Sequence, residues 1–452
     1  MINKFKKLNS ILPLLLFAFL LITNFAFSQK INYWERITGT RAPTNITSMA
    51  IDEINGNIWV TSGNNVYCYN GTTWINKGSP RTAPTNIVIA LNGDVYVSSD
   101  DCLYKLHNEE NTWVRFLSFS NSSVTISSIL IDNYSGAVYF GTNDYGFFRP
   151  IGSTWLPANN GLDSCGYIRA LALAPNSIIY AGTDSGVYHT TNLGTNWQSS
   201  LNFNANTSIY GLTIIDNNMI FAAADSNGIL KSMDGGMTWS QVLQVNGFNA
   251  SKIIYNSKTG HLFTTLVDSA IYNSVIYRST DLGNTWKDIT ASLFGIIINT
   301  LAFDNNNGTN PGQVYMGTSN GLYRAMPVVV EVSQPASATL AFGLVSTGTD
   351  EIDYITINNI GIKSSAFKPL EITGITVTNN SINPSANAFT LADNYSYPIK
   401  VRVDGNTKIA IKFSPTSSVA TGYFGKVEIK HNGNPSTTIV TLSGTGVDYD
   451  IR

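Results

Sequence analysis

The sequence predicts an all-β chain, a seven-bladed β-propeller followed by an immunoglobulin-like β-sandwich. Three observations support this prediction. Tryptophans recur about every 40 residues through the first two thirds of the chain, each interval holds four short apolar-alternating segments, and the period stops near Pro327. The recurring residues are Trp34, Trp74, Trp113, Trp155, Trp197, Trp239 and Trp286. Such a period is typical of radial repeats, whose units bury their apolar faces against one another.

Each unit is predicted to form four antiparallel strands, which make one propeller blade. The fourth unit shows the pattern most clearly, in residues 168–174, 178–182, 186–190 and 196–199. The equivalent first strands of the other units are residues 46–51, 87–91, 126–131, 209–214, 250–255 and 298–303.

The ring is predicted to close through the N-terminus. The seventh unit ends at residues 321–324, after its third strand, and contains no tryptophan. Residues 31–37 read INYWERI and form a fourth strand without a blade of its own. Pairing the two segments would remove the open sheet edges, so the propeller is expected to span residues 29–327.

Two segments match the pattern S/T-x-D-x-G-x-T-W, namely residues 232–239 (SMDGGMTW) and 279–286 (STDLGNTW). Here the chain resembles the Asp-box (BNR) repeat β-propellers and is similar to the sortilin-type and photosystem-assembly-factor propellers. The resemblance implies structural roles: carboxylates accepting backbone N–H bonds between third and fourth strands, left-handed glycines, and tryptophans packed into the blade. The residues in these roles are Asp234, Asp281, Gly236, Gly283, Trp239 and Trp286. The family includes sialidases, xyloglucanases, receptors and assembly factors, so the resemblance leaves the activity open.

Residues 1–28 have the composition of a signal peptide. Three lysines precede an apolar run at residues 14–22, and small residues stand at the expected cleavage point before Gln29. We therefore expect a mature chain without a transmembrane segment that is secreted, periplasmic or held at the cell surface. An uncleaved N-terminal anchor is the alternative.

The composition argues against several classes of partner. Charged residues make up 12% of the chain and the net charge is −2, so no basic surface is expected and no nucleic acid is predicted to bind. The histidines lie far apart without a metal-ligand spacing, and no cofactor motif occurs, so we expect neither a metal nor a cofactor. Cys68, Cys102 and Cys165 are expected to be buried thiols rather than a disulfide framework.

Residues 328–446 lack the 40-residue period and alternate as strands of a sandwich. The expected strands are residues 354–358, 370–377, 388–391, 408–413, 425–431 and 438–443. The segments FGLV (342–345), INNIG (357–361), FSP (413–415) and LSGTG (442–446) resemble the Hydin-type immunoglobulin-like module. That resemblance implies a spacer domain without an active site, followed by a tail at residues 447–452.

A ligand face is predicted on the side of the ring opposite the Asp-box turns. The turns between second and third strands there carry Asp101, Asp144, Asp184, Asp225 and Asp268, with Asn65 and Asn320 in the first and last blades. The second residues of the innermost strands are Thr47, Val88, Ser127, Arg169, Tyr210, Ser251 and Asn299. The candidate ligand-binding residues are Arg169, Tyr210, Asn299, Ser127, Asp144, Asp184 and Asp225. The alternatives are that the aspartates only form turns and that the inner residues only line a solvated channel.

Two other features of the sequence bear on the prediction of a site. The third strands of five blades carry a basic residue at the same repeat position, and we expect these side chains to lie on an exposed face of the strand. The residues are Lys105, His189, Lys231, Arg278 and Arg324. Arg149 lies in the sequence FRPI, which is a scrambled form of a sialidase motif. The turn at residues 266–275 is long and holds Ile271 and Tyr272, which are candidate contact residues.

These observations favour a monomeric, non-enzymatic binding or scaffold protein whose propeller face takes a protein or polysaccharide ligand. The alternative is a glycoside hydrolase of the sialidase or xyloglucanase type that uses the channel-mouth face. Such an enzyme requires two carboxylates roughly 5 to 9 Å apart.

Overall fold

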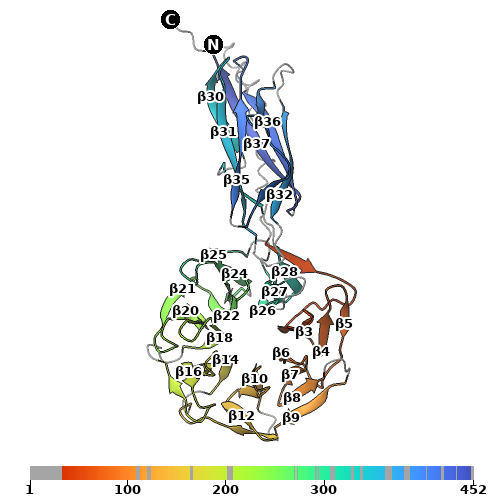
Figure 1. Cartoon of the computed structure of the whole chain (residues 1–452), viewed down its shortest axis with the longest axis vertical. Coiled ribbons are helices and arrows are strands. Elements are labelled where there is room, and N and C mark those ends of the chain that lie inside the picture. The colour runs from red at the N-terminus through yellow and green to blue at the C-terminus, as the bar shows by residue number, and fades with distance from the viewer. Residues whose placement is uncertain are drawn as a thin grey trace, which may run out of the picture. The chain divides into compact units, whose positions relative to one another are not determined.

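The computed structural model describes residues 33–448, apart from short internal segments. Those segments are 108–111, 120–123, 163–165, 201–206, 269, 272, 291–292, 294, 306–310, 327–329, 336–338, 362–368, 381–386, 404, 419–421 and 434. The expected leader, Cys165 and Tyr272 therefore lie outside the described residues. The described chain divides into two compact units, Tyr33–Ala325 and the described residues of 326–448 (Figure 1).

The first unit is a ring of seven four-stranded antiparallel sheets, as predicted (Figure 1). Blade one is β2 (Ser48–Ile51), β3 (Ile58–Ser62), β4 (Asn65–Tyr69) and β5 (Trp74–Asn76). Blade two is β6 (Asn86–Ile89), β7 (Val95–Ser99), β8 (Cys102–Leu106) and β9 (Val114–Ser118). Blade three is β10 (Ile126–Ile131), β11 (Val138–Thr142), β12 (Phe147–Ile151) and β13 (Thr154–Pro157).

Blades four to six follow the same order. Blade four is β14 (Ile168–Leu173), β15 (Ile179–Thr183), β16 (Gly186–Thr190) and β17 (Gln198–Ser199). Blade five is β18 (Ile209–Ile214), β19 (Ile220–Ala224), the single-turn 3₁₀ helix η1 (Asp225–Asn227), β20 (Gly228–Ser232) and β21 (Ser240–Leu243). Blade six is β22 (Asn249–Asn256), β23 (His261–Asp268), β24 (Asn273–Ser279) and β25 (Lys287–Asp288).

The seventh blade joins the two ends of the propeller, which confirms the predicted closure. It consists of β26 (Ile298–Phe303), β27 (Val314–Thr318), β28 (Gly321–Ala325) and β1 (Trp34–Ile37). In the β1–β28 ladder, Trp34 stands opposite Ala325 and Ile37 opposite Leu322. The Trp34 ring is buried, and its Nε1 donates a hydrogen bond to the carbonyl of Ile289 in the preceding blade at 2.9 Å.

The apolar core lies between adjacent blades. One cluster joins Tyr139 and Phe147 of blade three to Ile168 and Tyr188 of blade four. The close approach depends on glycine in the second strand: a Cβ at Gly141 would lie 2.5 Å from the Ile168 side chain. Each blade thus buries its alternating apolar residues against the next one, which is why the period is readable in the sequence.

The predicted exposed face of the third-strand cations is wrong for His189 and Arg278, which are buried, whereas Arg324 is exposed as predicted. Each of the third-strand cations stands directly opposite an aromatic residue of the second strand, on the same face of the sheet. The pairs are Tyr96 and Lys105, Tyr180 and His189, Phe221 and Lys231, Phe263 and Arg278, and Tyr315 and Arg324. His189 and Arg278 are buried, and the Nζ of Lys105 lies 5.4 Å from the centroid of the Tyr96 ring. Lys105 and Lys231 thus stabilise their blades through cation–ring contacts, and the His189 ring lies 5.9 Å from the Tyr180 ring between centroids.

Cys68 and Cys102 are buried and free. Burial raises the pKa of Cys68 to about 11, so its thiol stays protonated at neutral pH and reacts slowly. Cys68 therefore packs as a small apolar side chain, whereas the Cys102 thiol donates a hydrogen bond to the Asp101 carboxylate at 3.3 Å.

The second unit is a two-sheet sandwich, which confirms the predicted fold class. One sheet has the order β29 (Val330–Gln334), β31 (Glu351–Asn359), β35 (Asn406–Phe413), β33 (Phe389–Leu391). The other has the order β30 (Thr339–Ser346), β37 (Thr437–Val447), β36 (Tyr423–His431), β32 (Leu370–Asn379), β34 (Ile399–Val401). Side chains from both sheets form a single core, in which the Phe413 ring contacts Phe342, Phe389 and Tyr423.

The segment 232–239 forms a self-contained turn between β20 and β21. The Asp234 carboxylate accepts the backbone N–H of Thr238 at 2.9 Å and the Thr238 hydroxyl at 2.6 Å. Ser232 donates to Asp234 and accepts the N–H of Gly236, whose φ is 83°. In the segment 279–286 the Asp281 carboxylate accepts the same two bonds, from the backbone N–H and the hydroxyl of Thr285. Trp239 and Trp286 are only half-buried, and each packs against a core of residues that precede its turn in the chain.

The Asp234 turn predicts a pH-dependent stability. Hydrogen bonds from Thr238 lower the pKa of Asp234 from 3.8 to about 2, so its contribution is complete above pH 4 and is lost as the pH falls toward 2. Because the carboxylate is exposed, we expect Asp234→Asn to cost less than about 1 kcal/mol at pH 7. Urea unfolding of both proteins at pH 7, 4 and 2.5 checks this. A difference between them that did not shrink in acid would contradict the assignment.

Candidate functional site

Five innermost strands carry a β-bulge near their first residues. In β10, β14, β18, β22 and β26 the ladder to the second strand skips one residue. The skipped residues are Ser127, Arg169, Tyr210, Ser251 and Asn299. A bulge takes the extra residue out of the strand's alternation and re-aims its side chain. Blades three to seven therefore share a bulge at the second residue of the innermost strand. This is the repeat position from which several candidate ligand-binding residues were predicted.

Arg169 lies between two tyrosine rings. Its Cζ is 4.3 Å from the centroid of Tyr167 and 4.7 Å from the centroid of Tyr210, the bulge residue of the next blade. Both distances are within the range of cation–π interactions, which hold the guanidinium in place. The Nε of Arg169 is buried and has no hydrogen-bond partner among the described residues. A buried N–H without an acceptor costs about 1 to 3 kcal/mol.

Two carboxylates stand beside this arginine's strand, around Gly166. A Cβ placed on Gly166 would lie 3.3 Å from Oδ1 of Asp144 and 3.8 Å from Oδ2 of Asp184. The backbone N–H groups of the same two aspartates donate to the carbonyls of Gly166 and Tyr167. The Oδ1 of Asp184 is buried and has no partner within the described part of the chain. The two aspartates thus lie around Gly166, three residues before Arg169 in the chain, and we call Asp144, Asp184, Tyr167, Arg169 and Tyr210 together the Arg169 cluster.

The remaining candidates do not join the Arg169 cluster. The Ser127 hydroxyl donates to the carbonyl of Ile168, and Asn299 Nδ2 donates to the carbonyl of Ile46 at 2.8 Å, so both side chains brace neighbouring blades. Asp225 begins η1, is half-buried and has a φ of 22°.

The rest of the predicted acidic rim and the long turn also stay apart from the cluster. Asp268 accepts the N–H of Ala270, as a turn-forming residue does. Ile271, in the same turn, is exposed. Of the predicted acidic rim, the structure places Asp144 and Asp184 around Gly166, on the segment that leads into the arginine's strand.

Arg149 takes part in a structural contact rather than a ligand site. Its Nη1 donates to the carbonyl of Leu193 at 3.1 Å and to the Thr195 hydroxyl at 3.0 Å, both in the following blade. The arginine of the FRPI segment therefore links two blades.

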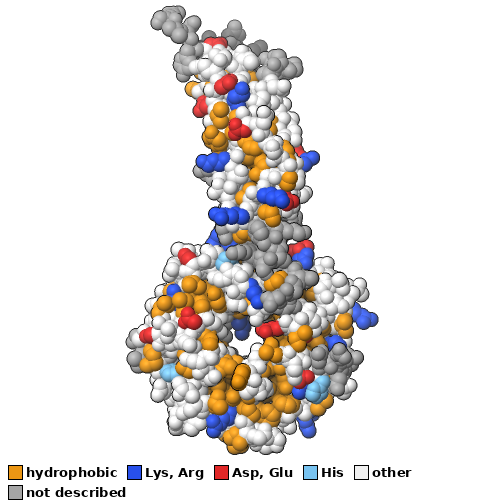
Figure 2. All heavy atoms as spheres, viewed as in Figure 1, with side chains coloured by type: hydrophobic (Ala, Val, Ile, Leu, Met, Phe, Trp, Pro, Cys, Tyr) orange, Lys and Arg blue, Asp and Glu red, His pale blue; other side chains and the backbone are white. Residues whose placement is uncertain are grey.

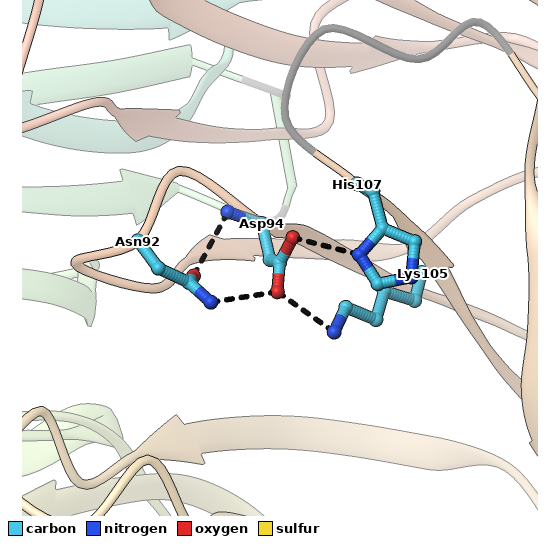
Figure 3. Close-up of polar contacts among 4 residues, drawn as sticks. All are labelled: Asn92, Asp94, Lys105 and His107. Carbon is cyan, nitrogen blue, oxygen red and sulfur yellow. Dashed lines mark hydrogen bonds and ion pairs between the residues drawn. The ribbon is translucent and has the colours of Figure 1, made fainter.

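A charged cluster in blade two is also structural (Figure 3). Asp94 lies 2.7 Å from the Nζ of Lys105 and 3.1 Å from the Nδ1 of His107, and Asn92 Nδ2 donates to it at 2.8 Å. Burial alone would raise the pKa of Asp94, but the hydrogen bonds from Lys105, Asn92 and His107 lower it overall. Because its oxygens are already occupied by protein donors, this cluster stabilises the blade and is not a ligand site.

The described residues contain neither a candidate metal site nor a candidate membrane-spanning helix. No group of three or more His, Cys, Asp or Glu side chains is placed to hold a metal ion. Among the same residues, no helix has the length and apolarity needed to cross a membrane.

Solved structures share the propeller fold. No protein-family model matches the chain, and no curated protein matches it. A streptogramin B lyase structure matches with a TM-score of 0.54 and 13% identity over 65% of this chain and 97% of the lyase. YCF48 from Cyanidioschyzon merolae matches with a TM-score of 0.50 and 13% identity over 66% of this chain and 99% of YCF48. YCF48 bound to D1 peptide matches with a TM-score of 0.50 and 15% identity over 65% of this chain and 95% of that chain.

Proposed function

We propose that the propeller is a non-enzymatic binding module that takes a peptide segment of a protein partner at the Arg169 cluster. The observation that carries this proposal is the pair of buried, unpartnered polar atoms within the described residues, Nε of Arg169 and Oδ1 of Asp184. One is a hydrogen-bond donor and the other an acceptor. A ligand that supplies both an acceptor and a donor removes both desolvation costs when it binds.

A peptide has this complementary character. Its carbonyl or carboxylate oxygens accept from a guanidinium, and its N–H or ammonium groups donate to a carboxylate. The two tyrosine rings restrict the guanidinium before the ligand arrives, which reduces the entropy lost on binding. YCF48, whose fold this ring shares, was solved with a D1 peptide bound, and this supports a peptide rather than a sugar as the ligand.

The proposal extends to the other parts of the chain. The hydrogen bonds of Asp234 and Asp281 support assignment of their turns to the Asp-box class. The segments quoted above support a Hydin-type sandwich over residues 328–446 that acts as a spacer after a propeller at 29–327. The leader-like residues 1–28 support export, with the mature monomer secreted, periplasmic or at the cell surface.

Binding by peptides selected from a display library tests the proposed site. We expect the double variant Arg169→Ala with Tyr210→Phe, made in the chain from Gln29 onward, to bind them at least about tenfold more weakly, because a charge-assisted hydrogen bond is lost. Its melting temperature should stay close to that of the parent. Arg115→Ala removes an exposed arginine from β9 and is the matched control, with binding unchanged. Peptide binding that persisted in the double variant would refute the assignment.

The glycoside hydrolase is the second candidate, and the Asp144–Asp184 pair is what favours it. Because both carboxylates lie within 4 Å of one point, their separation is compatible with glycosidase pairs, which are roughly 5 to 9.5 Å apart. Incubation of the purified chain with sialosides and β-glucans tests this alternative. Hydrolysis that disappears in Asp144→Asn or Asp184→Asn would replace the binding proposal with an enzymatic one.

A further inference from the structure

A cavity of about 390 Å³ lies at blade one, on the face that carries the turns between second and third strands. The loop from β1 to β2 forms one wall, and the ends of β3 and β5 with the start of β4 form the other. The lining side chains include Arg41, Thr44, Ser62, Tyr67 and Asn76. The lining therefore combines one cation with hydroxyl and amide groups, and it contains no carboxylate.

Neither the lining Arg41 nor the neighbouring Arg36 has a carboxylate partner among the described residues. Arg41 is exposed at the lip and has a left-handed φ of 67°, which is unfavourable for a residue with a side chain. Arg36 reaches the adjacent segment: its Nε and the carbonyl oxygen of Pro43 lie 3.4 Å and 3.2 Å from the same Cβ position on Gly321. The neighbouring carboxylate, Glu35, is 2.8 Å from Arg324 and is thereby occupied.

We propose that this cavity binds a carboxylated sugar, a residue of the uronic acid class. The guanidinium of Arg41, with Arg36 nearby, supplies the charge that a carboxylate requires. The Thr44, Ser62 and Tyr67 hydroxyls exchange hydrogen bonds with sugar hydroxyls.

The amide of Asn76 supplies one further donor to the sugar. Its Oδ1 already accepts the N–H of Gly78 at 2.7 Å, which leaves Nδ2 to donate. The cavity volume is within the range of small-ligand sites.

The hydroxyl and amide groups decide between a sugar acid and a simple anion. A small anion such as acetate would satisfy the arginines and leave Thr44, Ser62 and Tyr67 to water. A neutral sugar would satisfy these hydroxyls and leave the arginines without an anion. This site belongs to blade one, whereas the Arg169 cluster belongs to blades three to five, so each proposal can fail without the other.

Calorimetric titration of the chain from Gln29 onward with sodium D-glucuronate, D-glucose and sodium acetate tests the proposal. We expect glucuronate to bind at least about tenfold more tightly than either glucose or acetate. Arg41→Ala should weaken glucuronate binding by at least about tenfold, and Arg36→Gln should weaken it less. Arg115→Ala, on β9, should leave it unchanged.

Four outcomes would overturn the proposal. They are the absence of glucuronate binding at tens of millimolar, equal affinity for acetate, equal affinity for glucose, and binding unchanged in Arg41→Ala. Because Arg41 is exposed in a loop, its variant should keep the parent's melting temperature. If it does not fold, Tyr67→Phe and Arg36→Gln provide the same comparison.

Discussion

A chain that begins at Ala42 instead of Gln29 is expected to lose much of the propeller's stability and to aggregate. The truncation removes β1, and with it the buried Trp34 and Ile37 side chains. Loss of a buried tryptophan alone costs about 3 to 5 kcal/mol. It also leaves the backbone groups of β28 unpaired along an open sheet edge, which promotes pairing between chains. Size-exclusion chromatography and thermal unfolding measure both effects.

The control for this truncation is a chain that begins at Tyr33. It lacks the same leader but retains β1, so it should stay monomeric and melt like the chain from Gln29. A monomeric chain from Ala42 with an unchanged melting temperature would show that β1 does not close the ring.

The second large effect is expected in the sandwich, where Phe413→Ala should cost about 3 to 5 kcal/mol. Phe413 is fully buried, and its ring stacks on Phe389 at 4.7 Å between centroids. The eight tryptophans all lie between Trp34 and Trp286, within the propeller, so tryptophan fluorescence reports on that unit alone. We expect Phe413→Ala to lower the melting temperature of a transition seen by far-ultraviolet circular dichroism. The melting temperature of the transition seen by tryptophan fluorescence should not change.

Phe424→Ala provides the matched control, because Phe424 is 49% exposed on the neighbouring strand β36. It should change neither transition appreciably. If Phe413→Ala instead moved the fluorescence transition by the same amount, the two units would unfold as one and the proposed division of the chain would be wrong.

The blade count and the ring closure could be predicted because they depend on local patterns. Alternation and the tryptophan period act within one blade and its neighbour, so the expected strand at 126–131 coincides with β10. The ends of the strands were predicted less exactly: β2 begins at Ser48, two residues after the expected start. In the sandwich, β29, β30 and β34 were not predicted, because apolar and polar residues alternate less regularly there. The sandwich also has no internal repeat against which these strands could be aligned.

The candidate site could be predicted only in part, because it depends on contacts between blades. The sequence indicated Arg169 and Tyr210 by their repeat position but could not show the bulges, which are set by register with the second strand. It missed Tyr167, which lies just before the aligned strand, although an aromatic two residues from the arginine was a visible signal. Likewise, the burial of His189 depends on packing that repeat position alone does not reveal.

Hydrogen–deuterium exchange of the chain with a selected peptide bound tests the central claim most directly. We predict that the peptide slows exchange at residues 143–146, 166–169, 184–186 and 208–211, which surround the Arg169 cluster. Exchange at residues 234–238 and 281–285, in the turns between third and fourth strands, should not change. Protection confined to those two turns or to the sandwich, with none around Arg169, would contradict the proposed binding face.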